Sequence, residues 1–460
     1  MVITPPKTAP LNLTVTPSEV SLEDKINIYQ ISELHKEIDC LKRRLSLIPR
    51  PVEIACKRMH ELWWSITSLL GLGYLHNGSR VKAQAVNANP TITLPKIPPQ
   101  AMPAPRLFLD ITATYKSTFN TGVQRVIREL CRQGEADGAL APVIIEHGQF
   151  VTVPNLTPLV FQSGDRLLLM DSSWTLTSHY PQALKSAKSQ GAEIILGVYD
   201  LIPLQHPGFV QPHFTALFDE WLRTITPYCT SALAISKYSA ESLLSWMREN
   251  SDAKAITSVG WFHLGADFPD MTIANNPDVR DFDKIKSDYI LSVGTIEPRK
   301  GYSVALDTFD KLWREGSDLS YVIIGRHGDL ALHLIERITN HPLYGIKLFW
   351  PQNVDDHLLA LYYKNSIGVI IPAMAEGFGL PLIEASFHGK PIIASDLPVF
   401  KEIAGNDVIF FSTANSKDLA HKIKNDLASG EKSTSPHISD WARATQNMIK
   451  IVKTNSYQIH

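Results

Sequence analysis

The stretch that decides the fold is Ala375-Glu376-Gly377-Phe378-Gly379-Leu380-Pro381-Leu382-Ile383-Glu384-Ala385. Before it runs Ile367-Gly368-Val369-Ile370-Ile371-Pro372, a short apolar and β-branched segment that is typical of a buried strand. After it, a helical pattern continues to near Gly389. The sequence therefore predicts a strand, a glycine loop and a helix in direct succession.

This loop combines an anion-binding turn with two carboxylates. Gly377 and Gly379 let the backbone approach a ligand closely, and Pro381 suits a first helical turn, whose unpaired amides attract an anion. Glu376 and Glu384 would repel a phosphate beside them, so they are better suited to accept hydrogen bonds from hydroxyl groups. We expect a sugar and a ribose on either side of a diphosphate.

A second loop carries the complementary charge. The predicted strand 289–294 ends at Gly294 and leads into Thr295-Ile296-Glu297-Pro298-Arg299-Lys300-Gly301. Arg299 can donate to two phosphate oxygens at once, while Lys300 supplies a mobile point charge. The pair suits a diphosphate, and a solvated basic loop is the alternative.

The Glu-x7-Glu stretch with its Glu-Gly-Phe-Gly-Leu-Pro core resembles the donor signature of retaining GT-B glycosyltransferases of the glycosyltransferase 4 type, which include bacterial mannosyltransferases. The alternative is an ordinary Rossmann turn with solvated glutamates. The resemblance implies an α/β fold of two Rossmann-like, doubly wound parallel sheets that face a cleft. It also implies three catalytic residues, Glu376, Arg299 and Lys300, and a set of donor-binding residues: Gly377, Phe378, Gly379, Leu380, Glu384, Gly294, Val354 and Gly122.

The first domain is predicted to open with a strand at 106–111 and a helix at 121–133. Thr121-Gly122-Val123-Gln124-Arg125-Val126 resembles the first loop of a subset of bacterial GT-B enzymes, where acceptor and donor phosphate meet. Helical patterns separate most of the later strands, which indicates parallel sheets. These strands are predicted at 143–146, 167–171, 193–199, 232–235, 321–325, 346–349, 367–372, 391–395 and 408–411.

Acceptor or sugar contacts are predicted at Tyr199, Asp200 and His206, which follow a strand end. In similar enzymes a His stands where this chain has Tyr199, and Tyr can still donate a hydrogen bond. The alternative for His206 is a solvated loop side chain. Ser236 resembles the start of a family Ser-x-x-Ser loop, and helix capping and substrate contact are both open for it.

Composition excludes several classes. Lys and Arg number 44 against 46 Asp and Glu, so no nucleic-acid footprint is visible. The 4 cysteines form no Cys-x-x-Cys pair, which favours a reducing compartment and argues against a structural zinc site. The start has no signal-peptide pattern, and the apolar run 63–75 is too short to span a bilayer. We expect a cytoplasmic protein.

The first 104 residues form an extension that the resemblance does not cover. A heptad pattern at 22–48 predicts a coiled coil for self-association or a partner, and a single helix packed on the body is the alternative. Basic residues leading into aromatic ones at 50–75 suggest peripheral contact with the inner face of the membrane, or a satellite helix. The predicted divisions are 1–104, ending in a Pro-rich linker, the acceptor-side domain 105–285, the donor-side domain 286–435, and a helix at 436–460 that crosses back to the first domain.

The resemblance implies retaining transfer of a hexose, with GDP-mannose as the first hypothesis, to a glycan or lipid-linked glycan in polysaccharide or O-antigen assembly. Arg299 and Lys300 would neutralise the leaving diphosphate, so neither a metal nor another cofactor is expected. Asp281-Phe282-Asp283 is interpreted as a solvated linker rather than a metal motif. A catalytically silent scaffold subunit, favoured by Tyr199, and a nucleotide-sugar epimerase remain as alternatives.

Overall fold

The computed structural model describes residues 105–117, 121–250, 255–267, 282–405, 407–427 and 439–459, all within the compact unit Asn89–His460. The predicted coiled coil at 22–48, the amphipathic segment at 50–75 and the linker before residue 105 lie outside the described residues, as does Asp281. Among the residues described, no helix combines the length and hydropathy needed to cross a bilayer.

The first sheet has the order β3-β2-β1-β4-β5-β6-β7 and is parallel except for the pair β2 and β3. Its central strands are buried on both faces, which explains why Glu193–Val198 is a nearly continuous apolar run. The strands are β1 Leu107–Asp110, β2 Ala141–Glu146, β3 Gln149–Thr152, β4 Arg166–Leu169, β5 Glu193–Val198, β6 Ser231–Ala234 and β7 Ser258–Trp261.

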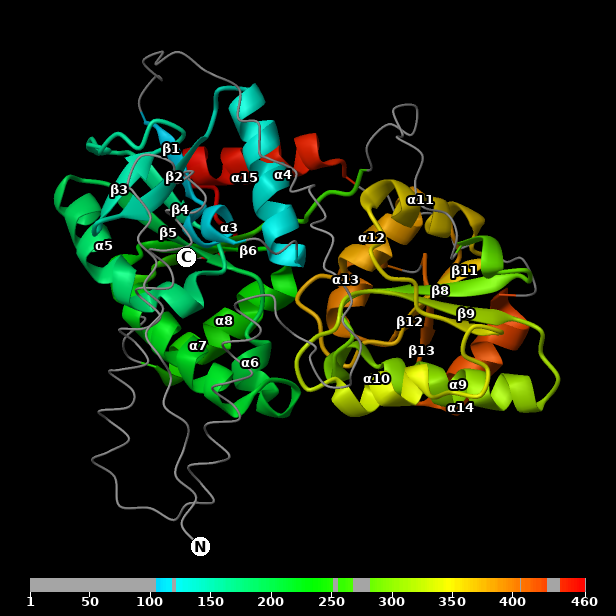
Figure 1. The fold of residues 1–460 in the computed structure, drawn as a ribbon. Coiled ribbons are helices and arrows are strands. Elements are labelled where there is room, and N and C mark those ends of the chain that lie inside the picture. Colours follow the sequence, from blue (N-terminus) through cyan, green and yellow to red (C-terminus); the bar gives the residue numbers. More distant parts are fainter. Residues whose placement is uncertain are drawn as a thin grey trace, which may run out of the picture. The chain divides into compact units, whose positions relative to one another are not determined.

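Helices cover both faces of this sheet (Figure 1). Leu184, Trp221 and Leu243 belong to one buried cluster, and Leu130 and Met448 belong to another. The helices are α3 Thr112–Lys116, α4 Gly122–Ala136, α5 Tyr180–Ser189, α6 Ile202–Gln205, α7 Pro212–Ile225 and α8 Lys237–Glu249, with short 3₁₀ turns η1 Ser173–His179, η2 Pro207–Phe209 and η3 Thr226–Tyr228.

The second sheet is parallel throughout, in the order β10-β9-β8-β11-β12-β13. Its strands are β8 Tyr289–Val293, β9 Ser320–Ile324, β10 Leu348–Phe349, β11 Gly368–Ile371, β12 Ile392–Ser395 and β13 Ile409–Phe411. The helices are α9 Tyr302–Arg314, α10 Leu332–Thr339, α11 Asp356–Asn365, α12 Leu380–Phe387, α13 Pro398–Ala404 and α14 Ser416–Lys422, with shorter turns η6 Phe282–Lys284, η7 Pro298–Lys300 and η8 Ile423–Leu427. The predicted pair of doubly wound α/β sheets is confirmed.

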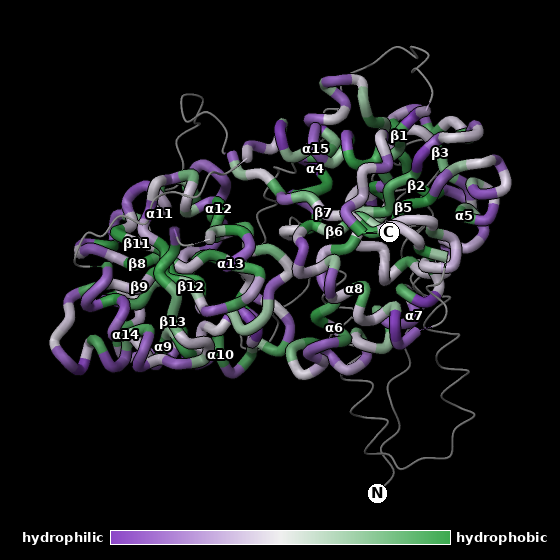
Figure 2. Tube along the Cα trace, turned by 180° about the vertical axis from the view of Figure 1, so that it is seen from behind, coloured by the Kyte–Doolittle hydropathy of each residue, from purple (hydrophilic) through white to green (hydrophobic). Residues whose placement is uncertain are grey.

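The last helix, α15 Trp441–Thr454, packs on the first domain against α4. Beyond it, Ile459 pairs with Val259 in an antiparallel bridge, and the Arg166 guanidinium donates to the Lys453 carbonyl at 2.8 Å. Figure 2 shows the apolar strands enclosed by more hydrophilic outer segments. Residues of α15 and the segment after it therefore pack on the first domain.

Three strands differ from the sequence prediction. β3 was not predicted; it pairs with β2 through a tight turn in which His147 and Gly148 both have positive φ. β7 was not predicted either, because its short Ser-Val-Gly-Trp sequence has no clear strand pattern. The strand expected at 346–349 is only Leu348–Phe349, because Lys347 still donates its amide to the Leu343 carbonyl in a turn.

Candidate active site

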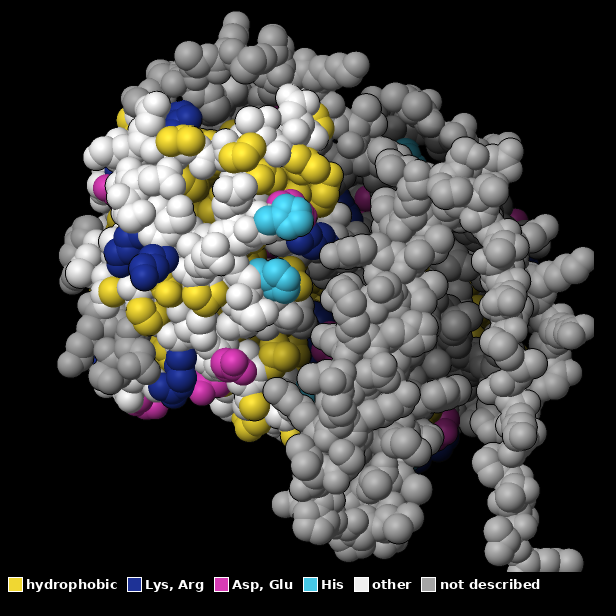
Figure 3. Space-filling model, turned by 60° about the vertical axis from the view of Figure 1, so that its left-hand side comes forward, with side chains coloured by type: hydrophobic (Ala, Val, Ile, Leu, Met, Phe, Trp, Pro, Cys, Tyr) yellow, Lys and Arg dark blue, Asp and Glu magenta, His cyan; other side chains and the backbone are white. Residues whose placement is uncertain are grey.

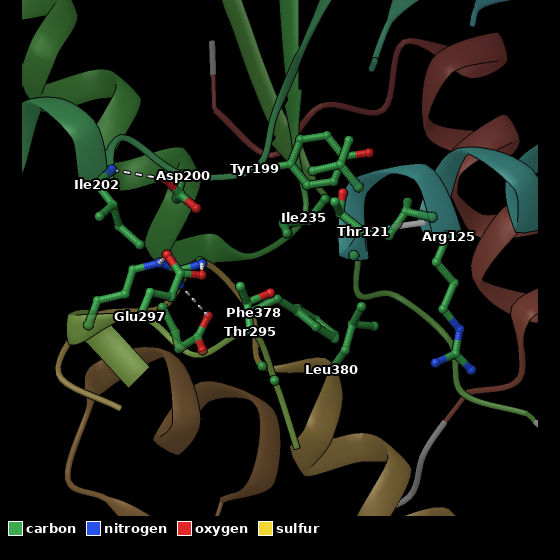
Figure 4. A pocket seen from close by; sticks show the side chains of 18 of the residues that line it. Thr121, Arg125, Tyr199, Asp200, Ile202, Ile235, Thr295, Glu297, Phe378 and Leu380 are labelled. Carbon is green, nitrogen blue, oxygen red and sulfur yellow. Dashed lines mark hydrogen bonds and ion pairs between the residues drawn. The ribbon is translucent and has the colours of Figure 1, made fainter. Parts of the chain in front are cut away.

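The candidate site is a cavity of about 820 Å³ whose walls come from both domains. It lies where loops leave the carboxyl ends of β5, β8 and β11, the usual place for a ligand in open α/β sheets. Most of the residues predicted from the sequence line it: Gly122, Tyr199, Asp200, Gly294, Arg299, Lys300, Val354, Glu376, Gly377, Phe378, Gly379, Leu380 and Glu384. In Figure 4, Asp200 and Glu297 lie on one side of Phe378 and Arg125 lies on the other.

The signature loop follows β11 and enters α12 through Gly379, whose φ of 103° is a conformation that favours glycine. Leu380 and Pro381 form the first turn of the helix, as expected for a proline without an amide hydrogen. Glu376 therefore lies on the loop before α12, and Glu384 lies within α12. Both are buried, at 8% and 4% exposed.

Glu376 is held between the two predicted phosphate-binding cations. Lys300 forms an ion pair with one carboxylate oxygen, and Arg299 Nη1 lies 3.3 Å from the other. Burial alone would raise the pKa of Glu376, but the attraction of Lys300 and Arg299 outweighs it and lowers the pKa. Glu376 is therefore ionised in the folded protein.

Arg299 is oriented by a second carboxylate, that of Glu297. The guanidinium Nη2 donates to Glu297 Oε1 at 3.1 Å. Burial lowers the pKa of Arg299, but Glu376 and Glu297 raise it by a larger amount. The loop thus carries a charged guanidinium in a fixed orientation. Sequence reasoning noted Glu297 only as part of the loop; its position two residues before Arg299 was the available signal.

Glu384 is anchored from both domains. Arg125 Nη1, on α4, lies 2.5 Å from Oε1 of Glu384, and the Tyr363 hydroxyl donates to Oε2 at 2.8 Å. Neither partner was predicted as a site residue. Arg125 was visible only as the fifth residue of the Thr-Gly-Val-Gln-Arg-Val loop, and Tyr363 lies inside the ordinary apolar pattern of α11.

The loop backbone is also held from the first domain. Ser236 donates to the Gly377 carbonyl at 2.7 Å, and its oxygen accepts the Ser239 amide at 3.0 Å. The Ser239 hydroxyl donates to the Tyr199 carbonyl at 2.6 Å. Ser236 therefore caps α8, as one of the two sequence hypotheses proposed, and binds the signature loop in addition.

A second connection between the domains lies next to Ser236, at the start of α8. The Glu402 carboxylate, on α13, accepts the amides of Lys237 and Tyr238 at 2.6 and 2.8 Å, and His263 Nε2 lies 2.8 Å from it. Burial would raise the pKa of Glu402, but these hydrogen bonds lower it. A carboxylate from the second domain thus occupies the N-terminus of α8.

Of the three residues predicted to contact the acceptor or the sugar, Tyr199 and Asp200 line the cavity and His206 does not. Asp200 lines the cavity, and its carboxylate accepts the Ile202 amide at 3.0 Å (Figure 4). Burial raises the pKa of Asp200 more than Arg299 lowers it. The Tyr199 hydroxyl is buried without a hydrogen-bond partner among the described residues. His206 is exposed, contacts Phe209 with the two rings tilted at 39°, and is not among the residues that line the cavity.

Val354, one of the predicted donor-binding residues, lines the cavity. Asn353 before it has a positive φ, and Asp355 caps α11 by accepting the Leu358 amide at 2.8 Å.

Within the described parts of the chain, no group of three or more His, Cys, Asp or Glu is arranged to hold a metal ion. On the face in Figure 3, charged side chains are scattered among hydrophobic and uncharged ones.

The fold and the loop of paired acids and bases resemble those of the group 1 glycosyltransferases, and a comparison with protein families agrees. Residues 278–438 match the sequence model of the family described as "Glycosyl transferases group 1", so this part of the chain is a group 1 glycosyltransferase domain. The resemblance to bacterial mannosyltransferase-like members of the glycosyltransferase 4 type is confirmed.

Curated relatives with this similarity include the Serotype-specific mannosyltransferase WbdA of Escherichia coli, 30% identical over an alignment of 374 positions that covers 75% of this chain. The chain spans only 44% of the length of that protein. The O-antigen chain mannosyltransferase RfbU of Salmonella typhimurium is 26% identical over 231 residues, 50% of this chain and 59% of its own.

Solved structures with a similar fold support the GT-B architecture. Trehalose-6-phosphate synthase OtsA matches with a TM-score of 0.55 at 12% identity, over 77% of this chain and 99% of that one. Anabaena Alr3699/HepE, solved in complex with UDP-glucose, matches with a TM-score of 0.51 at 13% identity, over 76% and 97%. At these identities the similarity establishes the fold alone.

Substituting Gly377 tests the close approach of the signature loop to the first domain. A Cβ at this position would lie inside contact distance of the Tyr199 carbonyl and 2.8 Å from Asp200 Cβ. Gly377→Ala should therefore lower the free energy of unfolding by about 1–3 kcal/mol, measured by denaturant titration. Gly208→Ala is the matched control, because no atom lies within 4 Å of its added Cβ. Equal losses in the two variants would contradict the packing described.

Proposed function

We propose that the protein is a retaining glycosyltransferase that moves a hexose from a nucleoside diphosphate sugar to a glycan or lipid-linked glycan acceptor in polysaccharide or O-antigen assembly. The observation that carries this proposal is the common cavity of Arg299, Lys300, Glu376 and Glu384. Two cations suit a diphosphate, and two carboxylates suit the hydroxyl groups on either side of it.

Charge stabilisation is the chemistry that the basic loop can supply. Negative charge grows on the leaving nucleoside diphosphate as the glycosidic bond breaks. Arg299 and Lys300 line the cavity and would neutralise this charge, and the first turn of α12, which follows the signature loop, lines the same cavity. We propose that this makes a metal ion unnecessary, in which case transfer persists in the presence of a chelator.

The carboxylates would position the donor. Glu376, kept ionised by its cations, would accept hydrogen bonds from hydroxyls of the transferred sugar, and Glu384 from those of the ribose. The acceptor hydroxyl would attack on the face from which the leaving group departs, with the departing phosphate as its base. The anomeric configuration of the donor is then kept in the product, which NMR of the new linkage tests.

The part of the cavity around Asp200 is proposed to take the acceptor. Asp200 lines it next to an apolar wall that α6, α7 and the turns beside them provide. The members of this wall include Trp174, Phe209, Phe214, Phe218 and Trp221, and Trp174 contacts Phe214, Phe218 and Trp221 edge-on or tilted. Aromatic rings beside one carboxylate are suited to the apolar face of a sugar with one hydroxyl directed at Asp200.

The proposed donor is tested by thermal shift. A ligand that binds only the folded state raises the melting temperature, so GDP should raise it more than UDP or dTDP at equal concentration. The proposal of GDP-mannose rests on relatives that are named mannosyltransferases. A larger shift with UDP or dTDP would replace GDP as the donor nucleotide while leaving the transfer reaction in place.

Glu376 and Arg299 are proposed to act on the transition state. Glu376→Ala and Arg299→Ala should each lower kcat at least about tenfold, which is about 1.4 kcal/mol, measured as mannosyl transfer from GDP-mannose to a mannoside. Lys417→Ala, on the exposed start of α14, is the control. Wild-type rates in both site variants would reject the assignment, and an isomerised donor without transfer product would favour an epimerase.

Arg125 is expected to position Glu384 for the donor. Among the described residues, removing it leaves Glu384 with the Tyr363 hydroxyl as its hydrogen-bond partner, so Arg125→Ala should weaken nucleoside diphosphate binding about tenfold in calorimetry. In an Arg125→Ala/Glu384→Gln double variant the losses should be less than additive. Strictly additive losses would mean that the two side chains act independently.

A further inference from the structure

A second, shallower groove of about 590 Å³ lies on the first domain, outside the candidate active site. One wall is the exposed face of α15, and the other is the end of β7 with the segment that follows it. Arg443, Asn447 and Lys450 line the first wall and Trp261 and His263 the second. The proposed function uses none of these side chains.

The α15 wall is a stripe of polar side chains at helical spacing. Arg443, Asn447 and Lys450 recur every three or four residues, so they share one face of the helix, and all three are exposed. The opposite face, which includes Trp441, Met448 and Val452, is buried. Arg443 and Lys450 lie about 10 Å apart along the axis, a span that their long side chains can close on one anionic group.

The charged side chains that line the groove within the described residues are basic. Among the residues that the structure describes, no carboxylate lines the groove and none pairs with Arg443 or Lys450. Two acids that contact lining residues of the groove are already engaged: the Asp440 carboxylate accepts the Arg443 amide at 2.6 Å, and Glu402 lies 2.8 Å from His263 Nε2. Two cations with amide donors beside them and a Trp opposite are the side chains that bind a phosphorylated sugar.

The groove also adjoins the active site. The His263 ring lines the groove and lies 5.9 Å from the Phe378 ring, which lines the catalytic cavity. Leu264, the next residue, lines the cavity as well. An extended acceptor whose reactive end enters the cavity would therefore have its remote part within reach of this groove.

We propose that the groove between α15 and β7 binds the phosphate-bearing part of the glycan acceptor, held by Arg443 and Lys450. This inference rests on the proposed function for the identity of the acceptor. The groove would select acceptors that carry a phosphate ester and leave donor binding unchanged.

Calorimetry with two synthetic oligomannosides tests the proposal, one with a diphosphate ester at its reducing end and one with a methyl group there. Saturating GDP is present so that the donor loop is filled. The Arg443→Gln/Lys450→Gln variant should bind the diphosphate compound at least about tenfold more weakly than the wild-type protein, and the methyl compound equally well. Lys453→Gln, an exposed change on α15 outside the groove, should bind both compounds as the wild type does.

Equal affinity of the double variant and the wild-type protein for the diphosphate compound would overturn the proposal. So would an equal loss for both compounds, since it would mean a change in the fold or in the sugar contacts. A kinetic readout separates the groove from the chemistry: the double variant should raise the KM for the diphosphate acceptor and keep the donor KM and kcat. If binding follows this pattern but no sugar is transferred, the proposed function fails and the groove assignment stands.

Discussion

The ion pairs that Glu376 makes with Lys300 and Arg299 are the interaction on which the rest of the site depends. A buried carboxylate and a buried guanidinium each cost free energy unless an opposite charge lies beside them. Here Glu376 of the signature loop pairs with the two cations of the basic loop, and Glu297 forms a further ion pair with Arg299. The two loops are therefore fixed in one relative position, with both cations directed at the same cavity.

The same loop is also where the two domains meet. The Gly377 carbonyl accepts from Ser236, Glu384 accepts from Arg125, and Glu402 occupies the N-terminus of α8. Each contact joins residues that are more than a hundred positions apart in the chain. Because every one of them ends on the signature loop or close to it, the relative position of the domains and the geometry of the donor loop are linked.

The local features of the site could be predicted from sequence because they are local in origin. Apolar runs, glycines and a proline at the right offset specify the β11 to α12 turn, and the Arg299-Lys300 loop follows its strand directly. The partners of Glu384 could not be predicted in this way, since Arg125 lies 259 residues away and Tyr363 has the pattern of any core residue. β7 has no clear strand pattern either, and the close approach of Tyr457 and Gln458 to Gly260 is a contact between residues far apart in the chain.

We propose that the side chains of one cavity bind both the diphosphate and the hydroxyl groups of a nucleotide sugar. The most direct measurement is a crystal structure of the protein with GDP bound. We predict diphosphate oxygens within hydrogen-bond distance of Arg299 and Lys300, and ribose hydroxyls at Glu384. GDP bound elsewhere, or a diphosphate turned away from both cations, would contradict the account.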